Sequence, residues 1–426
     1  MLEFRKAAAP VPAIDEVELH RMMDELSVIG GGEGGSMTRL TLSKEDGQAR
    51  DWFAAWVRDH GLRLEVDGIG NMFGILDWAG PGAPTVMTGS HLDSQPNGGR
   101  FDGALGVVAA CNAVDTIKRA VESGKLTPKA NMTVVNWTNE EGARFQPSLL
   151  GSSVYSGALT LDFALNRVDG DNISVRDALS DIGYAGTSAP ALPDAYIELH
   201  IEGSDKLEKA GLKFAAFTRY WGATKYRLAF LGKQAHTGPT PMAERQDAVL
   251  AAAYLIAELK AMADRGGLDL HTSVGRLEVF PNSPNVVPAE AVLFIELRSG
   301  SPEILESAEA EFKDRIEACA QRAGVGYEVR SVDYRKAGRM DEGLVTLATQ
   351  TATSLGYETR YLDTIGGHDG VALADKCPSI VIAVPSVGGV IHHPTEFTTP
   401  EDRVIGTRIL TSMLWDFCML GNVLKG

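Results

Sequence analysis

Histidine and carboxylate side chains are concentrated in one glycine-rich segment, residues 89–103, directly after an apolar run. His91 and Asp93 flank a single residue, so on an extended backbone their side chains leave the same face and can share one target. Asp102 comes just before a second apolar run, 104–114, which has the pattern of a helix, and a helix N-terminus favours negative charge. Each feature alone is usually a surface pair or a helix cap. Together they indicate a metal site, provided that the rest of the chain supplies matching ligands.

Three more apolar or β-branched runs are followed by side chains of the same kind. The runs and the side chains after them are 132–136 with Glu140 and Glu141, 196–199 with His200, and 379–384 with His392. In open α/β sheets, ligands collect outside the carboxyl ends of the strands, so we expect these groups to converge. Two adjacent glutamates are as often a solvated acidic turn as part of a site. The imidazoles after the neighbouring strands favour the site.

Helical and strand-like patterns alternate along most of the chain. Helical spacing appears at 14–28 and 51–60, strand-like patterns follow at 62–66 and 71–76, and a helix at 401–420 closes the chain. Near-continuous apolar strands are typical of a sheet that is buried on both faces. The pattern predicts an α/β fold, with a mixed sheet flanked by helices.

The middle of the chain has a different pattern. It reads as a strand at 225–231, a helix at 243–263, strands at 273–280 and 291–297, and a helix at 302–323. This order predicts an inserted, smaller α+β domain at 213–330, with the main domain formed by 1–212 and 331–426. Its notable polar residues are His236, Asn285 and Arg298. Each of them alone would usually have a structural role.

Composition excludes several classes of function. The chain has 426 residues, enough for two domains, and a formal net charge of −16, which disfavours binding to nucleic acid or to an anionic membrane surface. No segment reaches the roughly 20 apolar residues that span a bilayer, and the N-terminus has no long apolar core. The four cysteines are widely spaced and show no C-x-x-C pair, so we expect reduced thiols in a cytoplasmic protein.

Eight separated motifs carry a family resemblance. They are GSHLDS, FDGALGV, TNEEGARF, LHIEGSDKLE, AHTGPTPMAERQDA, NVVP, GGHDG and SVGGVIHHPTEFT. The chain resembles the dinuclear zinc aminoacylase and carboxypeptidase clan. Within it, the chain is most similar to the hydantoinase/carbamoylase-type amidohydrolases, which include N-carbamoyl-L-amino-acid hydrolase, β-ureidopropionase and allantoate amidohydrolase. The resemblance implies a catalytic domain with an inserted lid domain, and a homodimer formed through the lid.

The resemblance also implies two divalent metal ions per chain. It makes Asp102 the bridging carboxylate, with His91 and His200 on one ion and Glu141 and His392 on the other. Imidazole and carboxylate ligands without thiolate suit Zn²⁺, Mn²⁺ or Co²⁺, with zinc favoured. Asp93 would hydrogen-bond the ring of His91 and fix its orientation.

The resemblance implies the catalytic and substrate-binding residues as well. Glu140 is the candidate general base, because it is next to a ligand yet projects differently and can pass a proton from the water to the leaving nitrogen. On the lid, Arg298 would clamp the substrate carboxylate with the help of Asn285, and His236 would donate to the oxyanion.

One stretch departs from the ureido-cleaving relatives, which usually read HIEQGP where this chain reads HIEGSD. Gly203 replaces the glutamine that would contact the carbamoyl group, and Asp205 replaces a proline. The sequence therefore does not identify the acyl group of the substrate. The sequence predicts that a metal-activated water hydrolyses a linear C–N amide bond in an N-carbamoyl (ureido) or related N-acyl amino acid. The alternatives are an aminoacylase or dipeptidase without ureido preference, and a binding protein that has lost catalysis.

Overall fold

The structure is a computed structural model that describes residues 7–425 and divides into two compact units. Unit 1 is the chain up to Thr218, Met340–Leu362 and the chain from Gly366; unit 2 is Arg219–Arg339 with Asp363–Ile365. The sequence analysis placed the smaller domain at 213–330. Most of β6 (Phe214–Tyr220) belongs to unit 1, where it pairs with β15 (Ser379–Val384), whereas β12 (Gly326–Arg335) pairs within unit 2. Both of these boundaries therefore fall several residues later along the chain.

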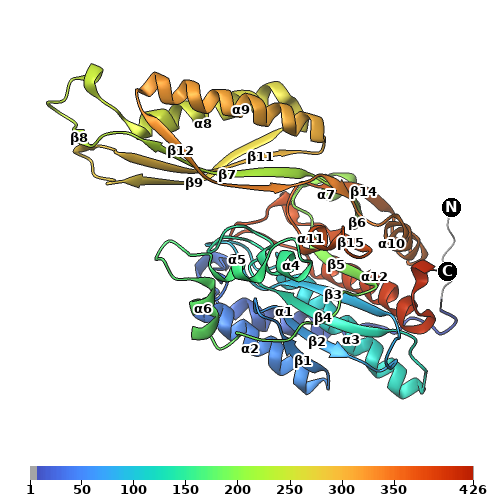
Figure 1. The fold of residues 1–426 in the computed structure, drawn as a ribbon. Helices are drawn as coiled ribbons and strands as arrows, with labels where there is room; N and C mark the ends of the chain where they lie inside the picture. The colour runs from blue at the N-terminus through green and yellow to red at the C-terminus, as the bar shows by residue number, and fades with distance from the viewer. Residues whose placement is uncertain (1–6, 426) are drawn as a thin grey trace. The chain divides into compact units, whose positions relative to one another are not determined.

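A large mixed sheet has the strand order β1-β2-β4-β3-β5-β15-β6-β13, with β14 beside β6 (Figure 1). Its strands are β1 (Arg63–Val66), β2 (Met72–Leu76), β3 (Thr85–His91), β4 (Asn131–Trp137), β5 (Ala195–Ile201), β6 (Phe214–Tyr220), β13 (Gly338–Arg339), β14 (Thr359–Thr364) and β15 (Ser379–Val384). The neighbours β4, β3, β5 and β15 run parallel, and β1, β2 and β6 pair antiparallel. The carboxyl ends of the four parallel strands therefore meet at one edge of the sheet.

Helices cover both faces of this sheet. They are α1 (Glu16–Val28), α2 (Lys44–Asp59), α3 (Ala104–Gly124), α4 (Leu150–Tyr155), α5 (Leu161–Leu165), α6 (Val175–Asp181), α7 (Lys206–Ala210), α10 (Glu342–Ser354), α11 (Asp369–Leu373) and α12 (Pro400–Leu420). The strands alternate between two cores: Val86 and Val134 pack with residues of α3 and α12, whereas Met87 and Val135 pack on the other side with a residue of α11. This period-two alternation with both faces buried explains the near-continuous apolar strands.

Unit 2 has its own sheet, with the strand order β12-β7-β11-β9, and two helices on one face of it (Figure 1). Its elements are β7 (Gly222–Leu231), β8 (Ala235–His236), α8 (Ala248–Gly266), β9 (His271–Phe280), β10 (Val286–Val287), β11 (Glu290–Ser299), α9 (Pro302–Ala323) and β12 (Gly326–Arg335). The strands of the larger sheet of unit 2 pair antiparallel. The mixed sheet flanked by helices and the smaller inserted α+β unit confirm the predicted fold class.

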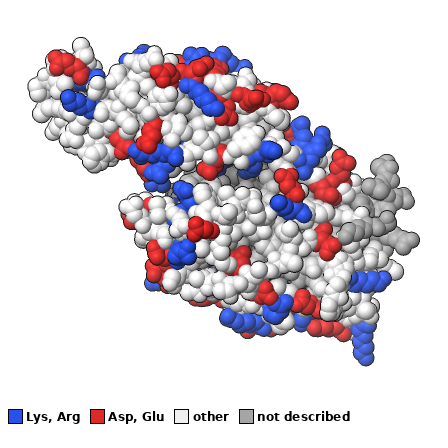
Figure 2. All heavy atoms as spheres, in the orientation of Figure 1, with Lys and Arg blue, Asp and Glu red and all other residues white. Residues whose placement is uncertain are grey.

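Charged side chains of both signs are intermixed on the face drawn in Figure 2. Among residues 7–425, no helix combines the length and the apolar character that a membrane crossing requires.

Candidate metal centre

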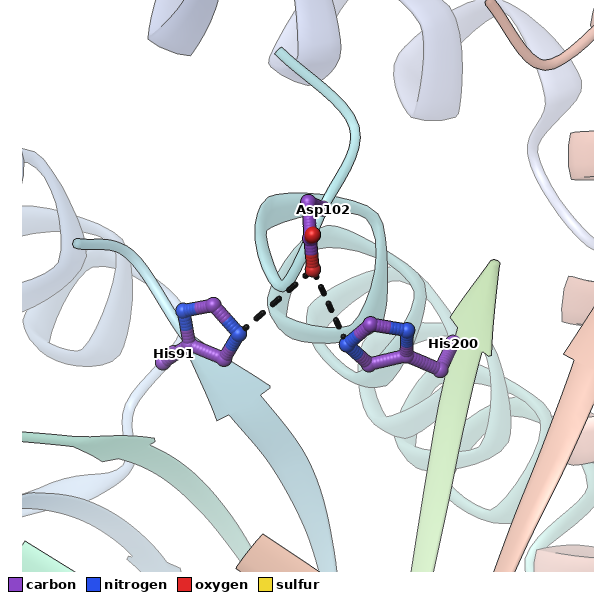
Figure 3. A group of neighbouring side chains, drawn as sticks. All are labelled: His91, Asp102 and His200. Carbon is purple, nitrogen blue, oxygen red and sulfur yellow. Dashed lines mark ion pairs between the residues drawn. The ribbon is translucent and has the colours of Figure 1, made fainter. Parts of the chain in front are cut away.

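The ends of β3 and β5 and the start of α3 bring two imidazoles to one carboxylate (Figure 3). His91 ends β3, His200 is the residue before the end of β5, and Asp102 lies two residues before α3. Oδ1 of Asp102 is 3.1 Å from Nε2 of His200 and 3.8 Å from Nε2 of His91. All three side chains are buried. Their ligand atoms lie within 4.8 Å of one another, close enough to hold one metal ion.

Two glycines allow the start of α3 to come this close to both strands. Gly103 has a φ of +66°, and a Cβ atom there would overlap the ring of His91. At Gly106, a Cβ atom would overlap the carbonyl oxygen of Leu199 and lie 2.7 Å from Cβ of Ser90. Leu199 and Ser90 each precede one of the two histidines. A larger side chain at either glycine would therefore move the carboxylate at the start of α3 away from the imidazoles.

The other carboxylate oxygen of Asp102 faces a second group of ligand-type side chains. Oδ2 of Asp102 is 3.1 Å from Nε2 of His392, and the same nitrogen is 3.2 Å from Oε2 of Glu141. Gln95 donates its backbone N–H and its side-chain amide to Glu141 at 3.2 and 2.9 Å. The side chain of His392 is 45% exposed, so this group forms the open side of the site. Asp102 is thus shared by two groups, each compact enough for one ion.

Glu140 lies next to both groups without belonging to either. Its side chain is buried, and its Oε2 is 3.5 Å from Nε2 of His91. Burial raises the pKa of Glu140 well above its usual range; His91 opposes this shift, and the neighbouring carboxylates add to it. The carboxylate of Asp93 accepts the backbone N–H groups of Glu140 and Glu141 at 3.2 and 3.3 Å. Asp93 therefore anchors the backbone from which the two glutamates project.

Asp93 contacts His91 differently from the expectation. β3 ends at His91, so the two side chains do not share the single extended strand that the sequence analysis assumed. Nδ1 of His91 lies 2.9 Å from the backbone carbonyl oxygen of Asp93 and 3.6 Å from its carboxylate. A ring N–H donated to this carbonyl orients the imidazole and leaves Nε2 to bind a metal.

The carboxylates of the two groups carry negative charge that favours cations at the site. Burial raises the pKa of Asp102, but His200 and His392 outweigh burial and hold this pKa well below its usual range. Burial lowers the pKa of His392, but Asp102 and Glu141 outweigh it and raise this pKa to about 11. Nε2 of His91 is buried without a hydrogen-bond partner, which is unusual for a purely structural histidine. Nitrogen and carboxylate donors of this kind fit divalent zinc, manganese or cobalt.

A third group, Glu198 with His200 and His368, also has ligand atoms within 4.8 Å of one another. Both oxygens of Glu198 are already engaged: one accepts the hydroxyl of Ser90 at 2.7 Å and the other accepts the backbone N–H of Gly370 at 2.9 Å. Glu198 therefore connects β5 to β3 and α11 just before His200 and His91, and this explains its complete burial.

Arg39 supports the site, although its sequence context gave no signal. It is a buried cation whose Nε donates to the carbonyl oxygen of Leu92 at 2.6 Å. Its Nη1 donates to the carbonyl oxygens of Leu26 and Ile29, at the end of α1, at 2.9 and 2.8 Å. Leu92 is the residue between the histidine and the aspartate of the HLD segment. Arg39 thus fixes the backbone that carries these two side chains, and only the tertiary structure shows this contact.

Glu396 also supports the site, and its place within the last motif was the only sequence signal. It accepts the backbone N–H groups of Phe101 and Asp102 at 2.7 and 3.0 Å. Burial raises the pKa of Glu396 to about 7, and the nearby Asp102 adds to this shift. Glu396 therefore connects the segment that carries His392 to the loop that carries the shared carboxylate.

In unit 2, the structure brings His236 and Asn285 together. His236 in β8 pairs with Val286 in β10, and the backbone N–H of Thr237 donates to the carbonyl oxygen of Asn285 at 3.2 Å. Both side chains are exposed. They lie beyond the ends of β7 and β11, on a two-stranded extension of the unit.

β11 starts at Glu290, next to β10, and Arg298 lies near its other end. At about 3.3 Å per residue, these two positions are about 26 Å apart along the strand. The guanidinium of Arg298 donates to the carbonyl oxygen of Ile365 at 2.6 Å and to the carboxylate of Glu296 at 2.8 Å. It lines a cavity of about 500 Å³ within unit 2. Within one chain, the structure therefore does not bring Arg298 to His236 and Asn285.

Comparisons with known proteins agree with this geometry. The family described as Peptidase family M20/M25/M40 matches residues 87–416. A putative hydrolase of Mycolicibacterium smegmatis is 44% identical over 396 residues, 92% of this chain and 90% of that protein. An N-carbamoyl-L-amino-acid amidohydrolase of Rhizobium meliloti is 34% identical over 388 residues, 91% of this chain and 92% of that protein. The solved structure of a hydantoinase/carbamoylase family amidase from Burkholderia vietnamiensis is 32% identical, with a TM-score of 0.91 over 95% of this chain and 98% of that chain. The chain therefore belongs to Peptidase family M20/M25/M40 and is an amidohydrolase of the hydantoinase/carbamoylase type, as its motifs predicted.

Proposed function

We propose that this enzyme hydrolyses the linear C–N amide bond of an N-carbamoyl or other N-acyl amino acid in a metal-dependent reaction. The observation that carries the proposal is the carboxylate of Asp102, which is shared by two groups of ligand-type side chains while the buried Glu140 stands beside both. The name of the Rhizobium relative supports the substrate class.

The two groups divide the work of holding cations. His91 and His200 with Oδ1 of Asp102 would hold one ion, and Glu141 and His392 with Oδ2 would hold the other. Two bound divalent cations would polarise the substrate carbonyl and lower the pKa of a water at the site.

Glu140 moves the protons in the proposed reaction. Its carboxylate takes a proton from the attacking water as the oxygen bonds to the carbonyl carbon. It then delivers that proton to the leaving nitrogen, so the C–N bond breaks with release of an amine. The buried carboxylate of Glu140 would hold the proton between the two transfers.

Unit 2 supplies the proposed substrate contacts. Arg298 would bind the substrate carboxylate through its planar fork, after exchanging Glu296 or the carbonyl of Ile365 for the ligand. His236 would donate to the oxyanion and Asn285 would assist substrate binding. Because these two lie beyond the Glu290 end of β11, which is about 26 Å from Arg298 along the strand, one small substrate cannot touch all three residues of a single chain. We therefore propose a homodimer in which unit 2 of one copy completes the site of the other.

A complementation assay tests the dimer. Arg298→Ala and His236→Ala variants are purified separately, each with low activity, and then mixed after dissociation. If the sites are shared, mixed dimers contain one intact site and recover activity. A mixture that stays as inactive as its parents, in dimers verified by mass, would contradict shared sites.

One experiment tests the reaction. Chelation should abolish activity, and Zn²⁺, Mn²⁺ or Co²⁺ should restore it, because these ligands bind metal in their deprotonated forms. Ammonia release from N-carbamoyl substrates would indicate ureido cleavage, whereas release of a carboxylic acid or a second amino acid would indicate an aminoacylase or dipeptidase. Full turnover by metal-free protein would refute the mechanism.

We further propose a cytoplasmic location. The free, buried cysteines support it; they are Cys111, Cys319, Cys377 and Cys418.

A further inference from the structure

Two histidine-bearing segments of unit 1 pack closely against each other just beyond the sheet. β5, which carries His200, and β15 are parallel neighbours, with Ile201 opposite Val384. The chain continues from β5 into residues 202–205 and from β15 towards His392. At Gly389, a Cβ atom would lie 2.5 Å from the backbone nitrogen of Asp205, so the two loops meet backbone against backbone. The loop after β5, residues 202–205, therefore has a fixed position beside the open group of the metal centre.

An isoleucine occupies the space next to the unusual glycine of this loop. A Cβ atom on Gly203 would lie 2.9 Å from Cδ1 of Ile391, and no other part of the described chain beyond its neighbours comes within 4 Å of that point. Ile391 directly precedes His392, whose side chain is 45% exposed, whereas His91 is 1% exposed. Gly203 is exposed, and Ile391 is half-buried with part of its side chain packed against the main core of unit 1, so the two lie together at the surface beside His392.

The polar side chains of the same loop are engaged elsewhere. Glu202 is buried and accepts the backbone N–H of Leu207 at 2.9 Å and the hydroxyl of Ser204. Asp205 pairs with Lys209 at 2.7 Å on α7. The side chains of this loop therefore satisfy one another and the start of α7. What remains towards Ile391 is a glycine without a side chain.

We propose that Gly203 and Ile391 form an apolar acyl subsite, so that the enzyme prefers amino acids carrying a hydrocarbon acyl group over those carrying a carbamoyl group. The inference rests on the proposed function and narrows its substrate class. A carbamoyl group and an acetyl group differ by NH₂ against CH₃ and have nearly the same size. The NH₂ group brings two N–H donors, which lose their water partners beside an apolar wall and gain no side-chain acceptor from these two positions.

The products follow from the bond that breaks. Water adds its oxygen to the acyl carbon, and its proton goes to the amino acid nitrogen as the C–N bond breaks. An N-acetyl or N-butyryl substrate then yields the free carboxylic acid and the amino acid. An N-carbamoyl substrate would yield carbamate, which decomposes to ammonia and carbon dioxide.

The experiment compares N-carbamoyl, N-acetyl and N-butyryl derivatives of one amino acid on zinc-loaded protein. We expect kcat/KM to favour acetyl over carbamoyl by at least about ten-fold, with a further gain for butyryl, because a methylene in an apolar pocket is worth about 10-fold or more. Titration calorimetry on Glu140→Gln protein measures the binding of the same compounds without turnover and should give the same order.

Two variants and one control locate the preference. Gly203→Gln and Ile391→Ser should each shift the acetyl-to-carbamoyl ratio towards carbamoyl; the overlap at Gly203 is with the flexible tip of Ile391, so the first variant should fold. Val387→Ser alters an exposed apolar residue of the same segment, outside the 4 Å surroundings of Gly203, and should leave the ratio unchanged. A preference for carbamoyl, or ratios unmoved in both variants, overturns this inference alone. No turnover of any of the three compounds overturns it together with the proposed function.

Discussion

Replacing Glu140 with glutamine separates proton transfer from metal binding. Glutamine keeps the size of the side chain and most of its hydrogen bonding, but it cannot accept a proton from the attacking water. In the structure, Glu140 belongs to neither ligand group, and its Oε2 lies 3.5 Å from Nε2 of His91. The variant should therefore keep its metal ligands while losing its base.

The expected loss of rate is that of general acid–base catalysis. Turnover should fall by about 10²- to 10⁴-fold, which corresponds to about 2.7–5.4 kcal/mol at 1.36 kcal/mol per factor of ten. Without metal, the Glu140→Gln variant should be no less stable than wild type. The folded pKa of Glu140 is raised above its ordinary value of 4.5, so wild type loses stability as pH rises from that value towards the raised pKa. Glu140→Gln removes this contribution and should be at least as stable at neutral pH.

The assay measures bound metal and rate on the same preparation. Glu141→Gln is the matched control, because its carboxylate belongs to the group with His392 and its loss should lower metal content as well as rate. Loss of metal from Glu140→Gln together with its rate would make Glu140 a ligand. Near-full rate with full metal content would remove it from the mechanism.

Three further changes test other parts of the site. Arg298→Lys should lower kcat/KM for carboxylate-bearing substrates by about 10- to 100-fold without lowering the melting temperature, because an ammonium cannot reproduce the planar fork; unchanged kinetics would exclude Arg298 from the site. Glu396→Gln should flatten the pH dependence of stability in metal-free protein, because the folded pKa of Glu396 is raised to about 7 and wild type loses stability between pH 4.5 and about 7. Urea unfolding at pH 5 and 8 measures the two free energies of unfolding. A difference between them as large as in wild type would contradict the raised pKa of Glu396. Arg39→Met should weaken metal binding by about 10- to 100-fold, as measured by competition with a chelating dye, and a loss of stability with unchanged metal affinity would limit Arg39 to a structural role.

Local signals predicted many elements well. The range 302–323 was predicted for α9 and matches its bounds, because Ser301 caps the first turn, Pro302 starts the helix and Gly324 ends it. β15 was likewise predicted at 379–384, as a continuous apolar run. β12 was not predicted, because it is an edge strand with a largely exposed, polar sequence that gives no clear alternation.

The convergence of the ligand-type side chains could be predicted because it follows from topology. Parallel strands bring their carboxyl ends to one edge, so the sequence order of strand and histidine was sufficient for His91, His200 and His392. The support around them could not be predicted in this way. The close approach at Gly106 and the carbonyl contact of Asp93 depend on backbone positions that no spacing rule describes.

The buried guanidinium of Arg39 makes the first helix part of the structure that orients His91, a proposed metal ligand. Its charge is stabilised by the carbonyl end of α1, and the same group holds the backbone beside His91. A protease cut or a deletion within α1 would therefore leave the buried charge of Arg39 without its carbonyl acceptors. It would also loosen His91, more than sixty residues away in sequence. An engineered enzyme that dispensed with this helix would need another set of oxygen acceptors for that arginine, or an apolar replacement for it together with a new support for the HLD segment.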